Sequence, residues 1–429
     1  MRSRPSTASG PGQVLRRALD DPRRRLLCIV VVTGLAGGLV GAAYLALLRV
    51  VQHLLGPSAW SNPIHLVILV AVGAAVALLT RWLGNPSDVE LLVDNIHVLG
   101  GAEDVRSLRS LIPVSLLCIG AGGALGPEAP LVTTTGSLGT WIGTRARLDR
   151  EDLRIVTIAG MAAGFTVLFG APLGSAVFAL EILHRRGLEY YEALLPSAIG
   201  ALCGYAVYAA ATGLGLRPMF QFPTIGPLRL ADLGWGAAAG VAGAVVAFTF
   251  TYLCAGLRQV VSRVPSSARP VLGGLLLGGC AFISPYALTN GEAHIEHLTT
   301  AKVAVGTLLL AAVMKLLASS ITVVTGWKGG FIIPLFFIGF CLARATAGIL
   351  PGSDQWVLAA GLMVACNVGV TKTPIGSTLV VTEMAGMAVL PSTLLAALVS
   401  LMLTSGVGMI ESQRTRFDAT DDEAVGAAS

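Results

Sequence analysis

The stretch Gly120-Ala-Gly-Gly-Ala-Leu-Gly-Pro-Glu-Ala-Pro130 decides the fold of this chain, because it places one carboxylate between a glycine-rich loop and a helix start. Proline suits the first helical turn, where its missing N–H group loses no hydrogen bond. Glu128 is therefore expected at a helix N-terminus, where the dipole and free amides stabilise negative charge. An anion would use the same amides, those around Gly126 and Ala129 included. The Glu128 side chain can thus occupy an anion site and open it when protonated or displaced.

A second glycine-rich stretch, Gly326-Trp-Lys-Gly-Gly-Phe-Ile-Ile-Pro334, has the same layout but carries apolar residues where the first has its carboxylate. The backbone amides of Phe331, Ile332 and Ile333 are left as hydrogen-bond donors at the start of the helix that follows. Two roles are open for Lys328. It could raise the local anion concentration, or it could extend its amine to the membrane interface.

The two stretches belong to an internal duplication. Pro172-Leu-Gly-Ser-Ala-Val-Phe-Ala-Leu-Glu181 matches Pro374-Ile-Gly-Ser-Thr-Leu-Val-Val-Thr-Glu383 at an offset of 374 − 172 = 202, and Gly126 to Pro130 matches Gly330 to Pro334 at an offset of 204. Two halves follow, roughly residues 27–215 and 232–411. A transporter built from two such halves places the paired elements around a shared site near the membrane midplane.

Composition puts the whole chain in a membrane. Of 429 residues, 54% are hydrophobic and only 12% are charged, and the mean hydropathy is +0.76. Soluble domains carry about 25% charged residues, so a chain of this composition has too few of them to form a water-exposed surface. We expect an all-α polytopic membrane protein. Nucleic-acid binding is excluded as a function because no basic cluster with interleaved aromatic residues is present.

The apolar runs differ in length. Leu26 to Leu55 and Leu233 to Val261 are ordinary membrane spans, whereas many others are short and interrupted by glycine or proline. Irregular backbone at membrane depth is tolerated only where protein or a water-filled cavity covers it. The broken helices therefore predict an internal site. The short runs are Pro63–Leu83, Leu111–Leu125, Ala129–Ile142, Leu153–Phe169, Pro172–Leu183, Pro270–Ile283, Phe331–Leu342 and Pro374–Met387.

Charges near the ends predict topology. Seven arginines precede the first span, which favours a cytoplasmic N-terminal tail at residues 1–26. The net charge of +5 is therefore interpreted as a signal of membrane topology. A short polar tail at 412–429 is also expected in the cytoplasm. The seven cysteines lie in or beside apolar segments without paired spacing, so we expect no metal site and no cofactor. The alternating residues Glu292 to His297 are interpreted as a solvated connector.

Taken together, Gly126-x-Glu-x-Pro130, Gly329-Gly-x-x-x-Pro334 and the two Pro-x-Gly-Ser…Glu helices resemble the CLC family of chloride channels and anion/proton antiporters. The resemblance covers residues 27–411. It implies an inverted repeat of broken and tilted helices, and a homodimer in which each subunit has its own pore in the lipid bilayer, here the inner membrane of a cell. It also implies that Glu128 matches the gating glutamate, and that Phe331 to Ile333 match the segment that touches a central anion.

Three departures from the family pattern bear on mechanism. The first anion motif has its nearest counterpart at Gly84-Asn-Pro-Ser-Asp88, which leaves Asn85 or Ser87 as the side-chain donor. A tyrosine near the C-terminal end has no equivalent, because the last tyrosine is Tyr286. The internal proton-accepting glutamate of coupled members falls at Ile182. Its loss suits a passive channel, although water or another group such as His184 could deliver protons.

The sequence therefore predicts a transporter of chloride, or of a related anion such as fluoride or nitrate, gated by Glu128 and either channel-like or loosely coupled to protons. Strict anion/proton antiport is the alternative within this class. An intramembrane hydrolase is disfavoured because no His-Glu-x-x-His, Gly-x-Ser-x-Gly or intramembrane Asp pair is present, so the chain is not expected to be an enzyme. A cation-coupled carrier is disfavoured, because it would be expected to point several carboxylates at its cavity, whereas this sequence offers amide-rich helix starts and a single dominant glutamate, Glu128.

Overall fold

The computed structural model describes residues 21–413, apart from 88, 103–107, 186–188, 213–217, 221, 224 and 351–353. The expected tails at 1–26 and 412–429 lie almost wholly outside the described residues. The described part is helical, and an isolated antiparallel bridge joins Gly126 to Gly330. The expected all-α membrane architecture is confirmed.

The helices divide into two sets that follow the duplication. The first set comprises α2 (Pro22–Leu55), α3 (Asn62–Leu83), α4 (Val89–Leu99), α5 (Leu108–Gly120), α6 (Glu128–Arg145), α7 (Arg150–Phe169), α8 (Pro172–Glu181) and α9 (Leu194–Thr212). The second set comprises α10 (Leu230–Val261), α11 (Arg269–Ile283), α12 (Glu292–Thr300), α13 (Val305–Val324), α14 (Ile332–Ile349), α15 (Gln355–Thr371), α16 (Pro374–Ala385) and α17 (Leu390–Thr404).

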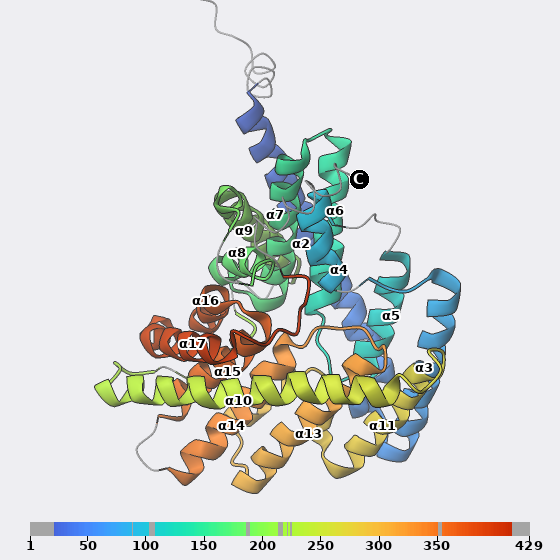
Figure 1. The fold of residues 1–429 in the computed structure, drawn as a ribbon, viewed down its shortest axis with the longest axis vertical. Helices are drawn as coiled ribbons and strands as arrows, with labels where there is room; N and C mark the ends of the chain where they lie inside the picture. Colours follow the sequence, from blue (N-terminus) through green and yellow to red (C-terminus); the bar gives the residue numbers. More distant parts are fainter. Residues whose placement is uncertain are drawn as a thin grey trace, which may run out of the picture.

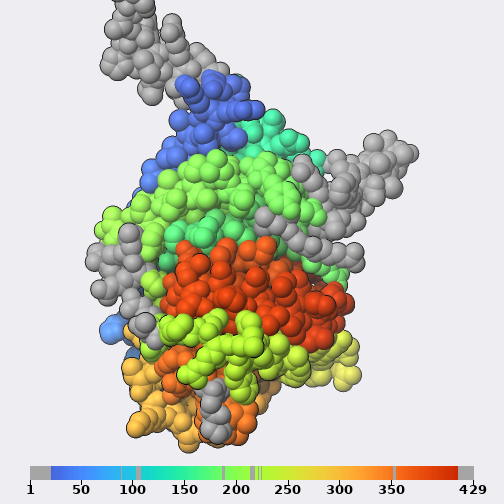
Figure 2. All heavy atoms as spheres, turned by 90° about the vertical axis from the view of Figure 1, so that its left-hand side faces the viewer, coloured from blue at the N-terminus to red at the C-terminus, as the bar shows by residue number. Residues whose placement is uncertain are grey.

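The two sets interlock rather than stand apart. α8 packs on α16 and α3 packs on α11, so each contact joins one half to the other. In Figure 1, α16 and α17 lie between α8 and α9 on one side and α10 on the other. Figure 2 shows the same order on the face turned toward the viewer, with the orange-red helices between green α9 and the yellow-green start of α10. The elements that carry the sequence motifs therefore meet inside the molecule.

Eight helices among the described residues are long and apolar enough to cross a membrane. Of the eight runs expected to be short, three lie in helices long and apolar enough to cross, namely α3, α7 and α14. α14 continues past Leu342 to Ile349 because its one basic residue, Arg344, directs its guanidinium onto the carbonyls of Leu298 and Ala301 at the end of α12. The connector expected at Glu292 to His297 is likewise helical, in α12.

Glycine allows the closest helix crossings. α2 and α9 cross where Gly34 lies against Gly200 and Gly38 lies against Gly204. A Cβ atom added at Gly34 would lie 2.8 Å from the Gly200 carbonyl oxygen, too near for any side chain. Membrane helices associate through such small residues because lipid gives no hydrophobic driving force between them. Many of the 52 glycines are thus explained by packing.

Candidate functional site

The two glycine-rich loops meet as an antiparallel pair. The Gly126 amide donates to the Gly330 carbonyl at 2.7 Å, and the Gly330 amide donates to the Gly126 carbonyl at 2.6 Å. A Cβ atom at either glycine would collide with the Glu128 carboxylate. The pairing explains why both loops are glycine-rich, and it corrects one expectation. Because the Gly126 amide is engaged in this bridge, it is not a free donor for an anion.

Glu128 lies where the two halves touch. It begins α6, its side chain is 1% exposed, and its Oε1 accepts a hydrogen bond of 2.5 Å from the Ile333 amide at the start of α14. The second carboxylate oxygen, Oε2, has no hydrogen-bond partner in the described part of the chain. The carboxylate of one half therefore accepts a hydrogen bond from a main-chain amide of the other half.

A large cavity approaches Glu128 from one side. This large vestibule has a volume of about 960 Å³ and ends at Pro127, directly before the glutamate. Its wall carries charges of both signs, with Arg49 from α2 and with Glu292 and Glu296 from α12. The vestibule lies at the C-terminal end of α2, because Gln52 and Gly56 also line it.

Beyond Glu128 the path narrows to an apolar space of about 20 Å³. Phe331 and Ile332, whose amides precede the first hydrogen-bonded turn of α14, line this narrow cavity together with Ala129. Ile182 and Ile410 line it as well. Ile182, the position expected to hold an internal proton acceptor in coupled relatives, thus faces the same small space as the Glu128 carboxyl group.

A small vestibule of about 170 Å³ opens on the far side of the narrow cavity. Ser87 and Thr133 line it, and both hydroxyl groups are buried without a hydrogen-bond partner among the described residues. Arg258 and Lys328 add positive charge to its wall, and Glu90 adds negative charge. An anion in this vestibule would meet two hydroxyl donors, two cations and one carboxylate.

The structure separates the two candidates for the first anion motif. Ser87 is 3% exposed and lines the small vestibule, whereas Asn85 is exposed at the surface. The reason is the chain direction between α3 and α4. Gly84 adopts a positive φ of 93°, so the chain turns inward after Asn85 and buries Pro86 and Ser87.

The paired Pro-x-Gly-Ser helices exchange carboxylates across the pseudo-two-fold axis. Glu181, at the end of α8, accepts from the amides of Ile375 and Gly376 at 3.1 and 2.6 Å. Glu383, near the end of α16, accepts from the amides of Leu173 and Gly174 at 3.2 and 2.7 Å. Each carboxylate caps the N-terminus of the opposite helix, which is a structural use of the dipole.

Several lining residues carry no recognisable sequence signal. Thr133 is one of three consecutive threonines, Arg258 lies at the end of a long span, and Ile410 follows the last helix. Ile410 is 4% exposed because the chain after α17 turns back into the molecule, where Gln413 donates to the carbonyls of Ile182 and Thr371. No group of three or more His, Cys, Asp or Glu side chains in the described ranges has a metal-binding arrangement.

Comparisons with known proteins agree with this geometry. Residues 93–405 match the family model described as voltage gated chloride channel. A chloride/fluoride channel protein of Pseudomonas syringae pv. tomato is 27% identical over 406 residues, which span 90% of this chain and 86% of that protein. A putative ion-transport protein of Escherichia coli, YfeO, is 26% identical over 412 residues, 89% of this chain and 93% of the relative.

Two solved structures share the fold. A slow cyanobacterial Cl⁻/H⁺ antiporter superposes with a TM-score of 0.77 at 20% identity, covering 94% of this chain and 98% of that chain. A CLC-type fluoride/proton antiporter superposes with a TM-score of 0.78 at 20% identity, covering 95% of this chain and all of that chain. At this identity the likeness establishes the architecture.

Proposed function

The chain belongs to the voltage gated chloride channel family, and we propose that it carries a small inorganic anion across the membrane between the large and small vestibules, with Glu128 as its gate. The hydrogen bond from the Ile333 amide to the Glu128 carboxylate carries this proposal. An amide that binds a carboxylate oxygen binds a permeating anion equally well once the side chain leaves. Protonation of Glu128 removes its charge and frees the amide.

The anion-binding groups follow from what lines the path. The amides of Phe331, Ile332 and Ile333 would hold the anion beside Glu128, with Ala129 at the facing helix start. Ser87 would supply a hydroxyl from the small vestibule, and Lys328 would attract anions toward it. Chloride and fluoride are the first substrates to test, because relatives are described with both. Nitrate is the third.

Channel-like conduction or loose proton coupling is the mode that the narrow cavity favours. Ile182 places hydrocarbon where a second carboxylate would accept protons, and Thr371 is the one other polar side chain among the described residues that line the cavity with Glu128. A proton leaving Glu128 in that direction therefore meets no second carboxylate in the described lining. Strict anion/proton antiport is the second candidate, supported by the architecture shared with two antiporters.

Orientation and assembly complete the proposal. The arginine-rich start of α2 favours the cytoplasm, which directs the large vestibule, at the other end of α2, to the outside and the small vestibule to the inside of a cell's inner membrane. The C-terminus would then also be cytoplasmic. Figure 2 shows helices of both halves, green α9 and orange-red α17 among them, on the face turned toward the viewer. These helices and their neighbours α8 and α16 expose apolar side chains. We propose that this face, in the lipid bilayer, packs against a second copy to form a homodimer. The exposed side chains of the four helices include Leu173, Leu195, Leu202, Ile375, Leu398 and Met402.

The test is anion efflux from liposomes that contain the purified protein. Wild type should release chloride or fluoride down its gradient once a potassium ionophore balances the charge. Glu128→Gln, which retains the shape but cannot ionise, should change the rate and its pH dependence. Glu151→Gln is the matched control, since Glu151 is an exposed carboxylate at the start of α7 that lines neither vestibule. Absence of anion flux from wild type would overturn the proposal.

A further inference from the structure

Lys315 is a buried charge on α13. Its side chain is 0% exposed, and its ammonium group donates to the main-chain carbonyls of Ala287, Leu288 and Thr289 at 3.2, 2.6 and 2.7 Å. Carbonyl oxygens can only accept, so the three contacts use three N–H groups, which the charged form of lysine has and the neutral amine does not. Lys315 is therefore a fixed positive charge inside the molecule.

This charge is surrounded by neutral groups. In the part of the chain that the structure describes, no carboxylate lies within ion-pair distance of the Lys315 ammonium group. The centroid of the Phe337 ring lies 5.1 Å from Nζ and adds a cation–π contact. Three carbonyls and an aromatic ring satisfy the ammonium group without cancelling its charge. Because a buried charge without a counter-ion is costly, ionisable groups of this kind in membrane proteins mark ion sites.

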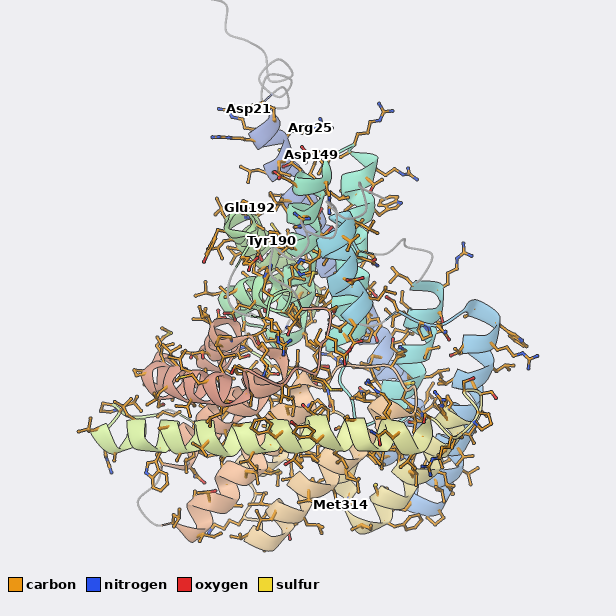
Figure 3. All side chains as sticks on the ribbon, in the orientation of Figure 1. Asp21, Arg25, Asp149, Tyr190, Glu192 and Met314 are labelled. Atoms are coloured by element: carbon orange, nitrogen blue, oxygen red, sulfur yellow. The ribbon has the colours of Figure 1, made fainter. Side chains whose placement is uncertain are left out.

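The Lys315 ammonium group lies directly behind the wall of the large vestibule. Thr289, whose carbonyl oxygen is 2.7 Å from Nζ, lines that vestibule. Figure 3 labels Met314, the neighbour of Lys315, at the end of the molecule opposite Arg25, which lies at the start of α2. The large vestibule is at the other end of α2, so the two observations agree. One residue thus separates the positive charge from the vestibule.

The charged side chains that line the large vestibule do not by themselves favour an anion. Arg49 carries one positive charge, whereas Glu292 and Glu296 carry two negative charges, a formal sum of 1 − 2 = −1. His294, which also lines the vestibule, packs its ring against Phe337. Lys315 brings the formal sum to zero. Without it, an anion would enter a negatively charged vestibule, and surroundings of low dielectric constant would weaken that repulsion little.

The same part of α13 is fixed relative to the gate. Ser319, one turn after Lys315, donates to the Ala124 carbonyl at 2.7 Å, in the glycine-rich loop that leads to Glu128. The Thr289 amide donates to a carbonyl of the same loop at 2.9 Å. The ammonium group is therefore held at a constant position both from the vestibule and from the loop before Glu128.

We propose that Lys315 is a specificity-determining residue that raises the affinity of the path for anions through space, by placing a positive charge behind the wall of the large vestibule. The inference rests on the proposed anion transport and names the residue that gives this end of the path its preference for negative ions. Lys315 does not touch the anion, because its three donors are engaged with carbonyls. Its effect therefore depends on its charge.

The experiment measures the initial rate of chloride efflux against chloride concentration in the Glu128→Gln protein, where no gating carboxylate competes for the anion. Gluconate replaces chloride at constant ionic strength, so that the screening of charges is the same throughout. Lys315→Gln and Lys315→Met, both neutral, should raise the half-saturating concentration about tenfold. Lys315→Arg retains the charge and should stay within about twofold of the parent. Lys302→Gln, an exposed lysine that lines neither vestibule, is the matched control and should equal the parent.

A second substitution separates charge from packing. Glu292→Gln, added to Lys315→Gln, removes one negative charge from the vestibule together with the positive one and so restores the formal balance. The half-saturating concentration should then return to within about threefold of the parent. A packing defect left by the loss of the lysine would persist in this double variant.

An unchanged half-saturating concentration in both neutral variants overturns the proposal, as does an equal rise in Lys315→Arg or a double variant without recovery. Where the maximal rate of a variant is too low for a concentration curve, chloride binding in detergent by isothermal titration calorimetry gives the same comparison. A Kd equal to that of the parent then counts against Lys315. Absence of anion flux from the parent and from wild type would instead overturn the proposed function.

Discussion

The Glu128 carboxylate in the first half of the chain accepts a hydrogen bond from the Ile333 amide in the second, across 205 residues of sequence. This contact occupies the point where the helix starts of both halves converge. It explains how one side chain can close the path at the point where main-chain amides of the other half are exposed. It also fixes where substitutions should act.

Gly126→Ala should open the gate without changing its charge. A Cβ atom at this position overlaps the Glu128 carboxylate, so the side chain must leave the Ile333 amide. We expect anion efflux at neutral pH to rise toward that of Glu128→Gln. Gly279→Ala, on an exposed face of α11 with open space around it, is the control. Flux and pH dependence equal to wild type in Gly126→Ala would contradict the assignment.

We expect the affinity for the transported anion to depend on a buried hydroxyl group in the small vestibule. Thr133→Val retains the shape and removes a buried hydroxyl with no partner among the described residues. The half-saturating anion concentration should rise about fivefold, the factor that one hydrogen bond of about 1 kcal/mol gives. Thr134→Val is the neighbouring control, because its hydroxyl already donates to the Pro130 carbonyl at 2.7 Å. Equal affinities in the two variants would exclude Thr133 from the path.

The exchanged carboxylates predict an effect on stability. Glu181→Ala leaves the amides of Ile375 and Gly376 without their acceptor, at a cost of about 1–3 kcal/mol. Glu383→Ala removes the equivalent cap on α8, but at a more exposed position, so its effect should be smaller. The stability of both variants is measured as the heat-induced loss of the monodisperse size-exclusion peak in detergent. A larger effect in Glu383→Ala than in Glu181→Ala would contradict this ranking.

Lys372 offers a test that separates backbone strain from hydrogen bonding. It ends α15 with a φ of 61°, where Gly170 ends α7 in the first half with a φ of 63°. Its buried ammonium donates to the Gly369 carbonyl and to both oxygens of Thr404 at 2.6 to 2.8 Å.

Lys372→Met should therefore lower the stability by about 1–3 kcal/mol, because it removes the three hydrogen bonds that the buried ammonium donates. Lys372→Gly should cost about 1 kcal/mol less, since glycine adopts the left-handed conformation without strain. Thermal unfolding of both variants in detergent checks the order. If the glycine variant proves less stable than the methionine variant, the strain argument fails.

The sequence predicts the duplication and most of the helices because matched residues at offsets of 202 and 204 survive in both halves. The position of Glu128 at the start of α6 also follows from its flanking prolines. The engagement of the Gly126 amide could not be predicted, since it depends on contact with Gly330 in the other half. Neither could the contacts of Arg150 and Arg154 with the last carbonyls of α4, because these arginines lie more than 50 residues along the chain from the carbonyls they bind.

The pH dependence of anion efflux in wild type and Glu128→Gln, measured side by side, tests the central claim most directly. Wild-type flux should rise as the pH is lowered from neutral, because protonation of Glu128 frees the Ile333 amide. Glu128→Gln should start at the raised level at neutral pH and should not rise further as the pH is lowered. An acid-induced rise of equal size in both proteins would contradict the account.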